Sequence, residues 1–255
     1  MIQPSELAQQ ISHSAEVIGY SISELSGDAT LPILALRKEA NPSSASPFRL
    51  YLSAGIHGDE PAGPLALLQL LSDASLPSDI DIVICPLINP SGFIAKTREN
   101  NKGHDLNRDF RHPKNPETTA VQQFLSNQAP FDLSICLHED WESHGFYLYS
   151  LAPDADQSVP RKILEAVSIV GPIDLSTEID GSPAESGLIQ RQVDQEIKER
   201  EDWPEAFYLY SKSPHAHFTT ESPSSTPIEQ RIKMQTVAVL QAIDLVRSKR
   251  EQAPT

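Results

Sequence analysis

Short apolar runs of strand length alternate with helix-like segments along the chain, and this alternation limits the possible folds more than any other feature. An apolar run from Arg49 to Ala54 precedes a leucine-rich helix that begins after Pro61, and further apolar runs cover residues 80–88 and 131–137. Strands that alternate with helices are typical of βαβ units. The pattern therefore predicts one α/β domain over residues 1–255, with a sheet flanked by helices.

The C-terminal part of the chain predicts two late strands and a long helix. Phe207 to Tyr210 and Ala216 to Thr220 have the length and residue types of short strands. The helix signal is a capping box at Thr226-Pro227-Ile228-Glu229, followed by apolar residues at helical spacing.

Composition excludes two classes of partner. The net charge of −15 and the pI near 4.9 argue against nucleic acid and anionic membranes, because both require a basic surface. Cys85 and Cys136 lie inside apolar runs and are expected to be buried free thiols, with a disulfide as the alternative. The segment 1–6 lacks the basic and apolar parts of a secretory signal, so we expect a cytoplasmic protein.

Ionisable residues follow three of the strand-like runs. His57 and Glu60 follow the first run, His138 ends the run at 131–137, and Glu221 follows the late strand at 216–220. Open α/β folds place such strand ends at one edge of the sheet. His57, Glu60 and His138 would form the two-histidine, one-glutamate ligand set of a catalytic zinc ion, one per chain.

Other interpretations of these residues remain open. His57 alone can be an ordinary loop histidine, and Glu60 can be a carboxylate that stabilises a helix N-terminus. Glu221 can be a solvated loop acid. His215 and His217 are spaced to share one face of a strand and form a rival metal pair, although a structural role fits them better because no third ligand is evident.

Four motifs together resemble the zinc carboxypeptidase family of the carboxypeptidase A type, and in particular its compact bacterial branch that includes murein tripeptide amidases. They are His57-Gly58-Asp59-Glu60, Asn89-Pro90-Ser91-Gly92-Phe93, Arg98-x-Asn100 followed by Gly103-x-Asp105-Leu106-Asn107-Arg108-x-Phe110, and His138. Their order and spacing agree with the family over residues 50–225. The resemblance implies a single-domain, mixed and mostly parallel twisted sheet of about eight strands, flanked by helices.

The resemblance also implies roles for individual residues. Arg98 would polarise the scissile carbonyl, Asn107 and Arg108 would bind the terminal carboxylate of the substrate, and Glu221 would be the general base. The expected activity is zinc-dependent hydrolysis of the C-terminal amide bond of short peptides with a free carboxylate. Cell-wall (murein) peptides are one candidate substrate class.

The chain departs from the family pattern at several positions. Members of the family often carry a tyrosine on a loop before the base, but residues 189–204 contain none, and only Tyr208 or Tyr210 could replace it. No catalytic tyrosine is therefore assigned. His104 and Asp59 also differ from the common family residues and are expected to tune substrate choice.

Two other functions compete with the peptidase. The first is an acylamino-acid deacylase of the succinylglutamate desuccinylase or aspartoacylase kind, which shares the zinc motif. The turn at Asn89-Pro90-Ser91-Gly92 and the Arg98-x-Asn100 pair favour the peptidase. The second is a zinc-binding protein without turnover, suggested by the missing tyrosine, against which the retained Glu221 argues.

Overall fold

The computed structural model describes residues 2–25, 32–40, 47–151, 156–191 and 193–252. Its main sheet has eight strands in the order β1-β2-β4-β3-β5-β10-β6-β9, and β7 and β8 form a separate hairpin. The strands are β1 (Ser21–Leu25), β2 (Ile33–Lys38), β3 (Arg49–Ala54), β4 (Asp81–Cys85), β5 (Leu133–Asp140), β6 (Tyr147–Ser150), β7 (Glu178–Ile179), β8 (Ser182–Pro183), β9 (Leu188–Gln190) and β10 (Ala216–Pro223).

The centre of the sheet is parallel. Strand β3 pairs in parallel with β4 on one side and with β5 on the other, and β5 pairs in parallel with β10. Antiparallel pairs join β1 to β2, β2 to β4, and β10 to β6. The prediction of a mixed, mostly parallel sheet of about eight strands is confirmed.

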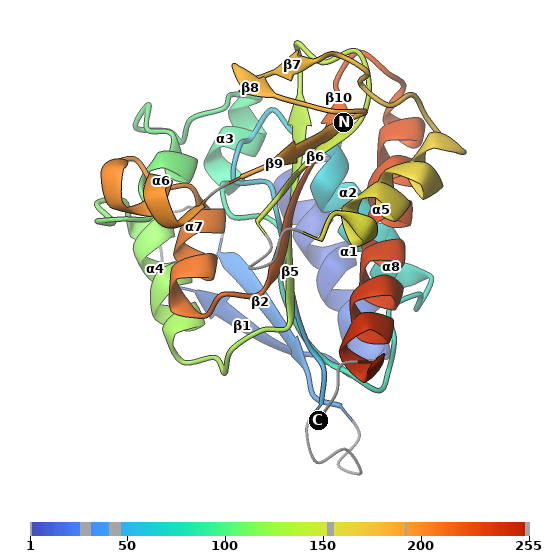
Figure 1. The fold of residues 1–255 in the computed structure, drawn as a ribbon. Coiled ribbons are helices and arrows are strands. Elements are labelled where there is room, and N and C mark those ends of the chain that lie inside the picture. The colour runs from blue at the N-terminus through green and yellow to red at the C-terminus, as the bar shows by residue number, and fades with distance from the viewer. Residues whose placement is uncertain (1, 26–31, 41–46, 152–155, 192, 253–255) are drawn as a thin grey trace.

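Helices cover both faces of the sheet (Figure 1). They are α1 (Pro4–Val17), α2 (Ala62–Ser72), α3 (Pro90–Ala95), α4 (Pro116–Ser126), α5 (Ser158–Ser168), α6 (Val193–Glu199), α7 (Glu205–Lys212) and α8 (Ile228–Gln252), with a short 3₁₀ helix, η1 (Leu106–Arg108). Figure 1 shows α1, α2, α5 and α8 on one side of the sheet and α4, α6 and α7 on the other. Among the helices described, none has the length and apolar content needed to cross a membrane.

Each face of the sheet has its own apolar core, because side chains alternate along a strand. On β3, Leu50, Leu52 and Ala54 pack in the core that includes α1, α2, α5 and α8. Tyr51 faces the other way and packs with residues of α4, η1 and α7. The functional residues of β5 and β10 lie on this second face, described below.

The predicted segment Phe207 to Tyr210 is wrong as a strand. It forms the middle of α7, which begins after Pro204. Asn89-Pro90-Ser91-Gly92 is more than a turn, because Asn89 caps α3 by accepting a hydrogen bond from the Gly92 N–H at 2.9 Å. Cys85 and Cys136 are both buried and free, as expected.

One buried glutamine joins α8 to the two strands that carry His138 and Glu221. The Gln235 amide donates to the His138 carbonyl at 2.7 Å and to Ser222 Oγ at 3.2 Å. Its oxygen accepts a hydrogen bond from Thr220 Oγ1 at 2.6 Å. Gln235 is fully buried, so no water is available to replace these bonds.

We expect Gln235→Leu to lower the free energy of unfolding by about 1 to 3 kcal/mol, because it leaves buried polar groups on β5 and β10 without partners. Chemical denaturation followed by circular dichroism measures the change. Gln9→Leu makes the same substitution on an exposed position of α1 and is the control. Equal stability of the two variants would show that Gln235 does not hold α8 to the sheet.

Candidate active site

The loop after β3 delivers His57 and Glu60 to the carboxyl edge of the sheet. Its tight course requires glycine at position 58, because an added Cβ would lie 1.9 Å from the carbonyl carbon of Gly92. The Gly58 N–H also donates to the Thr97 carbonyl at 2.9 Å. The loop therefore packs closely against the start of α3, and this contact fixes the backbone of the segment that carries His57 and Glu60.

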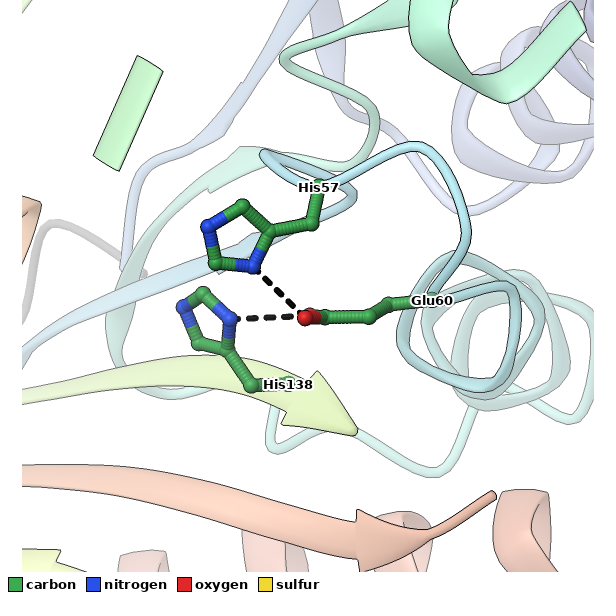
Figure 2. Close-up of side chains that lie close together, drawn as sticks. All are labelled: His57, Glu60 and His138. Carbon is green, nitrogen blue, oxygen red and sulfur yellow. Dashed lines mark hydrogen bonds and ion pairs between the residues drawn. The ribbon is translucent and has the colours of Figure 1, made fainter. Parts of the chain in front are cut away.

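His57, Glu60 and His138 form one compact group (Figure 2). Nδ1 of His57 lies 2.6 Å from Oε1 of Glu60, and Nδ1 of His138 lies 2.8 Å from Oε2 of Glu60. Ligand atoms from these three buried residues all lie within 4.8 Å of one another. Two imidazole nitrogens and a carboxylate are a donor set that suits zinc, so the residues present fit that ion.

Asp105 orients the first histidine. Oδ1 of Asp105 lies 3.3 Å from Nε2 of His57, and Oδ2 of Asp105 accepts a hydrogen bond from Nε of Arg98 at 3.0 Å. A carboxylate that accepts from the Nε2–H tautomer leaves Nδ1 of His57 free to bind a metal. The sequence motif contains Asp105, but the motif alone assigns no role to it. The available signal was its place in the polar loop, two residues before Asn107 and three before Arg108.

The charges in this group favour an anionic Glu60. Burial alone would raise the pKa of Glu60, but the adjacent imidazoles of His57 and His138 hold that pKa well below its ordinary value. Burial likewise opposes the ionisation of Asp105, and the neighbouring His57 and Arg98 reverse this effect and lower its pKa. Both carboxylates can therefore act as charged acceptors.

Glu221 lies beside the candidate metal-binding group of His57, Glu60 and His138, but its pKa is shifted in the opposite direction to that of Glu60. It is paired with His138 in the parallel register of β5 and β10. Burial raises the pKa of Glu221 well above its ordinary value, and the charges of Glu60 and Asp140 act in the same direction, against His138 and Arg98. A carboxyl group with a raised pKa at the wall of a cavity is suited to exchange protons.

Arg98, Asn107 and Arg108 come from the polar loop before α4. Nη1 of Arg98 lies 3.8 Å from Oε1 of Glu60. Oδ1 of Asn107 accepts a hydrogen bond from the Glu205 N–H at 2.9 Å, so this side chain also caps α7. Arg108 is about 41% exposed, and its Nε lies 3.6 Å from Oδ2 of Asp202.

All the predicted site residues line one cavity of about 710 Å³. His57, Glu60 and His138 lie there with Arg98, Asn107, Arg108 and Glu221, although they come from segments far apart in the sequence. Asp59 also lines the cavity, whereas His104 bonds through Nδ1 to Oδ1 of Asn115 at 2.6 Å.

The phenols in the cavity are not the ones that the sequence suggested. Tyr208 donates to the Gln122 carbonyl at 3.3 Å, and Tyr210 packs in an apolar cluster with Leu151. Among the described residues that line the cavity, the tyrosines are Tyr147 and Tyr149 of β6. The alternating aromatic residues of this strand were the signal that could have identified them.

Comparison with known proteins points to the same superfamily. A family model described as the succinylglutamate desuccinylase/aspartoacylase catalytic domain matches residues 47–191. Carboxypeptidase 2 of Trichophyton rubrum is 32% identical over 107 residues, which are 39% of this chain and 20% of that protein. Carboxypeptidase SOL1 of Arabidopsis thaliana is 28% identical over 140 residues, 47% of this chain and 28% of that protein. The chain therefore matches only a fifth to about a quarter of the length of these relatives.

Solved structures share the fold. A Shewanella baltica OS155 protein described as a candidate metallopeptidase superposes with a TM-score of 0.82 at 24% identity, over 94% of this chain and 91% of that one. A metallo-carboxypeptidase from Burkholderia cenocepacia gives a TM-score of 0.74 at 17% identity, over 96% of this chain and 69% of that one. The family match covers more than half of the chain, and the fold agrees with it. The chain belongs to the succinylglutamate desuccinylase/aspartoacylase catalytic domain family, within the zinc carboxypeptidase superfamily.

Proposed function

We propose that this protein is a zinc-dependent hydrolase that cleaves the C-terminal amide bond of short peptides with a free carboxylate. One observation carries the proposal: the metal-binding group, Glu221 and the Asn107-Arg108 pair line the same cavity. A metal-dependent amide hydrolase needs these three parts, namely a metal site, a group that transfers protons and a group that binds the substrate specifically. Murein peptides are one substrate class for the test panel, and the two free cysteines support a reducing, cytoplasmic setting.

His57, Glu60 and His138 would hold the zinc ion. When bound there, zinc would supply Lewis-acid polarisation of the substrate carbonyl and lower the pKa of water towards about 7. Asp105 keeps His57 in the tautomer whose Nδ1 is free.

The remaining groups bind the substrate and move protons. The Glu221 carboxylate accepts a proton from water and returns it to the nitrogen of the leaving amine, for which a raised pKa is favourable. Arg98 donates to the carbonyl oxygen as negative charge develops on it. Arg108 binds the terminal carboxylate, and this requires the substrate to replace Asp202, whose contact at 3.6 Å is loose.

A second candidate is the deacylation of an N-acyl amino acid, and the match to the desuccinylase/aspartoacylase family model favours it. In this reaction and in peptide hydrolysis, the bond cleaved is an amide and the leaving group is an amino acid with a free carboxylate. The two substrates differ on the acyl side. Hydrolysis assays with short peptides, murein tripeptide and N-acylated amino acids, each with and without zinc, separate them, and no hydrolysis in the panel would leave a zinc-binding protein without turnover.

Zinc content gives the first test of the site. We expect one zinc ion per chain, lost in His138→Ala because a ligand of the buried group is removed. Elemental analysis after dialysis measures it. The controls are His112→Ala, at an exposed histidine, and His215→Ala, whose ring is bonded to Ser134 and Ser213. Zinc retained in His138→Ala but lost in His215→Ala would mean that the wrong histidines were chosen.

Glu221→Gln tests the general base. We expect kcat to fall by about 10²- to 10⁴-fold with normal zinc content, because the amide cannot carry the proton. The control is Glu142→Gln, an exposed acid that lines the same cavity. Activity within a few-fold of the parent would remove Glu221 from the mechanism. Glu139 is a poor replacement, since its carboxylate already binds Arg231 at 2.5 Å and the Ala62 N–H at 2.7 Å.

Arg108→Ala tests recognition of the carboxylate. We expect the variant to lose most of its preference for a peptide with a free C-terminal carboxylate over the same peptide amidated, measured as the ratio of kcat/KM values. Arg111→Ala is the control, because this arginine lies on the same loop and pairs with Glu201 at 3.0 Å. If the preference is unchanged in Arg108→Ala, another group binds the carboxylate.

A further inference from the structure

A line of hydrogen bonds connects two histidines outside the metal site to the cavity. Nε2 of His215 lies 2.7 Å from Oγ of Ser134, and Nδ1 of His217 lies 2.6 Å from the same oxygen. Nδ1 of His215 bonds to the Ser213 carbonyl, and Nε2 of His217 lies 3.2 Å from Oγ1 of Thr219. Thr219 is half-buried and lines the cavity.

The Ser213 carbonyl can only accept, and this fixes the direction of the bonds. Nδ1 of His215 must therefore carry the proton, and Nε2 of a neutral His215 must accept one from Ser134. Ser134 has a single proton, so its oxygen can only accept from His217, and Nδ1 of His217 must carry a proton. Nε2 of His217 is then unprotonated and accepts a hydrogen bond from the hydroxyl of Thr219.

The assignment requires both histidines to be neutral, and their surroundings favour this. Burial lowers the pKa of His215, against weaker opposing effects of the Ser213 carbonyl and Asp132. Burial lowers the pKa of His217 further, and the nearby His215 and His138 act in the same direction. At neutral pH each ring therefore has one N–H and one acceptor nitrogen.

A second side chain beside Thr219 also donates its proton to a group inside the protein. Cys136 is the register partner of Thr219 in the parallel pair of β5 and β10, and it also lines the cavity. Its thiol donates to Oε2 of the buried Glu205 at 3.4 Å. Cys136 and Thr219, which we call the acceptor wall, thus donate their protons to Glu205 and His217, so towards a group in the cavity they can only accept a hydrogen bond.

The acceptor wall lies next to the reacting groups. Cys136 and Thr219 precede His138 and Glu221 by two residues on the same strand faces, a spacing of about 7 Å. Asn107, in the proposed carboxylate site, contacts Glu205, and Glu205 contacts Cys136. The wall therefore adjoins the reacting groups and is joined through Glu205 to the proposed carboxylate site, and we place the side chain of the leaving residue against it.

We infer that the acceptor wall selects leaving residues whose side chain carries a hydrogen-bond donor, a hydroxyl or an ammonium group, and that Ser134, His215 and His217 set this selection by orienting the Thr219 hydroxyl. The inference rests on the proposed function for the position of the substrate. The orientation of the Thr219 hydroxyl proton itself does not depend on catalysis. Ser134, His215 and His217 are positioning residues, because they act through Thr219.

The tautomers give a test that needs no activity. Long-range ¹H–¹⁵N correlation spectra of the full chain are expected to show His215 and His217 as Nδ1–H tautomers. In Ser134→Ala, His217 loses its acceptor and is expected to shift towards the Nε2–H tautomer, which turns the Thr219 hydroxyl around. An Nε2–H tautomer of His217 in the parent protein would overturn the inference.

Selectivity gives the second test. Peptides that end in threonine or valine, and in lysine or norleucine, are compared by kcat/KM, and the free amino acids of each pair are compared by calorimetric binding. We expect the donor-bearing member to be favoured about 3- to 10-fold, the range of one hydrogen bond. Thr219→Val and Ser134→Ala should bring the ratio near one with zinc content unchanged, and Thr119→Val on α4 should not.

The two readouts separate the possible failures. If no peptide is hydrolysed but free threonine binds more tightly than valine, the proposed function is wrong, and the inference that the acceptor wall selects donor-bearing side chains is supported. If peptides are hydrolysed but neither pair of side chains is discriminated, the inference about the acceptor wall is wrong and the proposed function is supported. The same conclusion follows if Thr219→Val still discriminates between the members of a pair.

Discussion

Parallel pairing of β3, β5 and β10 is the constraint on which the site depends. The register places Ala54 opposite Leu137 and His138 opposite Glu221, so the loop after β3 and the ends of the other two strands meet at one edge. Side chains alternate between the faces of a strand, so a slip of β10 by one residue would turn Glu221 into the apolar core on the other face. The hydrogen bonds of Gln235 to both β5 and β10 secure this register from the side of α8.

Buried carboxylates show how the surroundings divide chemical roles among similar side chains. Glu139 follows His138 directly, but it faces α2 and α8, where the Ala62 N–H and Arg231 satisfy it. Glu205 is equally buried and accepts hydrogen bonds from Tyr51 and Ser53 at 2.7 Å. A buried carboxylate without such partners is costly, and these partners explain why both acids are tolerated. Within the described part of the chain, Glu221 has no comparable set of donors, which is consistent with its proposed role in proton exchange.

The sequence predicted the strands at the centre of the sheet, because apolar runs are local signals. It also predicted seven site residues, all of which line the cavity, because they follow strand ends or lie in one polar loop. It failed where structure depends on distant residues. The aromatic run Phe207 to Tyr210 resembles a strand, but Asn107, far away in the sequence, caps the helix that contains it. Asp105, Tyr147 and Glu205 were missed as site components for the same reason. Their partners are His57, Asp140 and Tyr51, and these pairs form only when the sheet is assembled.

One polar network joins His57, Asp105, Asn107 and Glu205 beside the cavity. Asp105 contacts His57 and also accepts a hydrogen bond from the backbone N–H of Asn107 at 2.8 Å, so the proposed metal site and the proposed carboxylate site share one support. Asn107 caps α7 through Glu205, and Glu205 accepts the thiol proton of Cys136 in the acceptor wall. A shift of α7 would therefore disturb Asn107 and Cys136 together. The groups proposed to bind the leaving residue are thus linked to the orientation of His57 in the proposed metal site, although no single segment of the chain contains all of these groups.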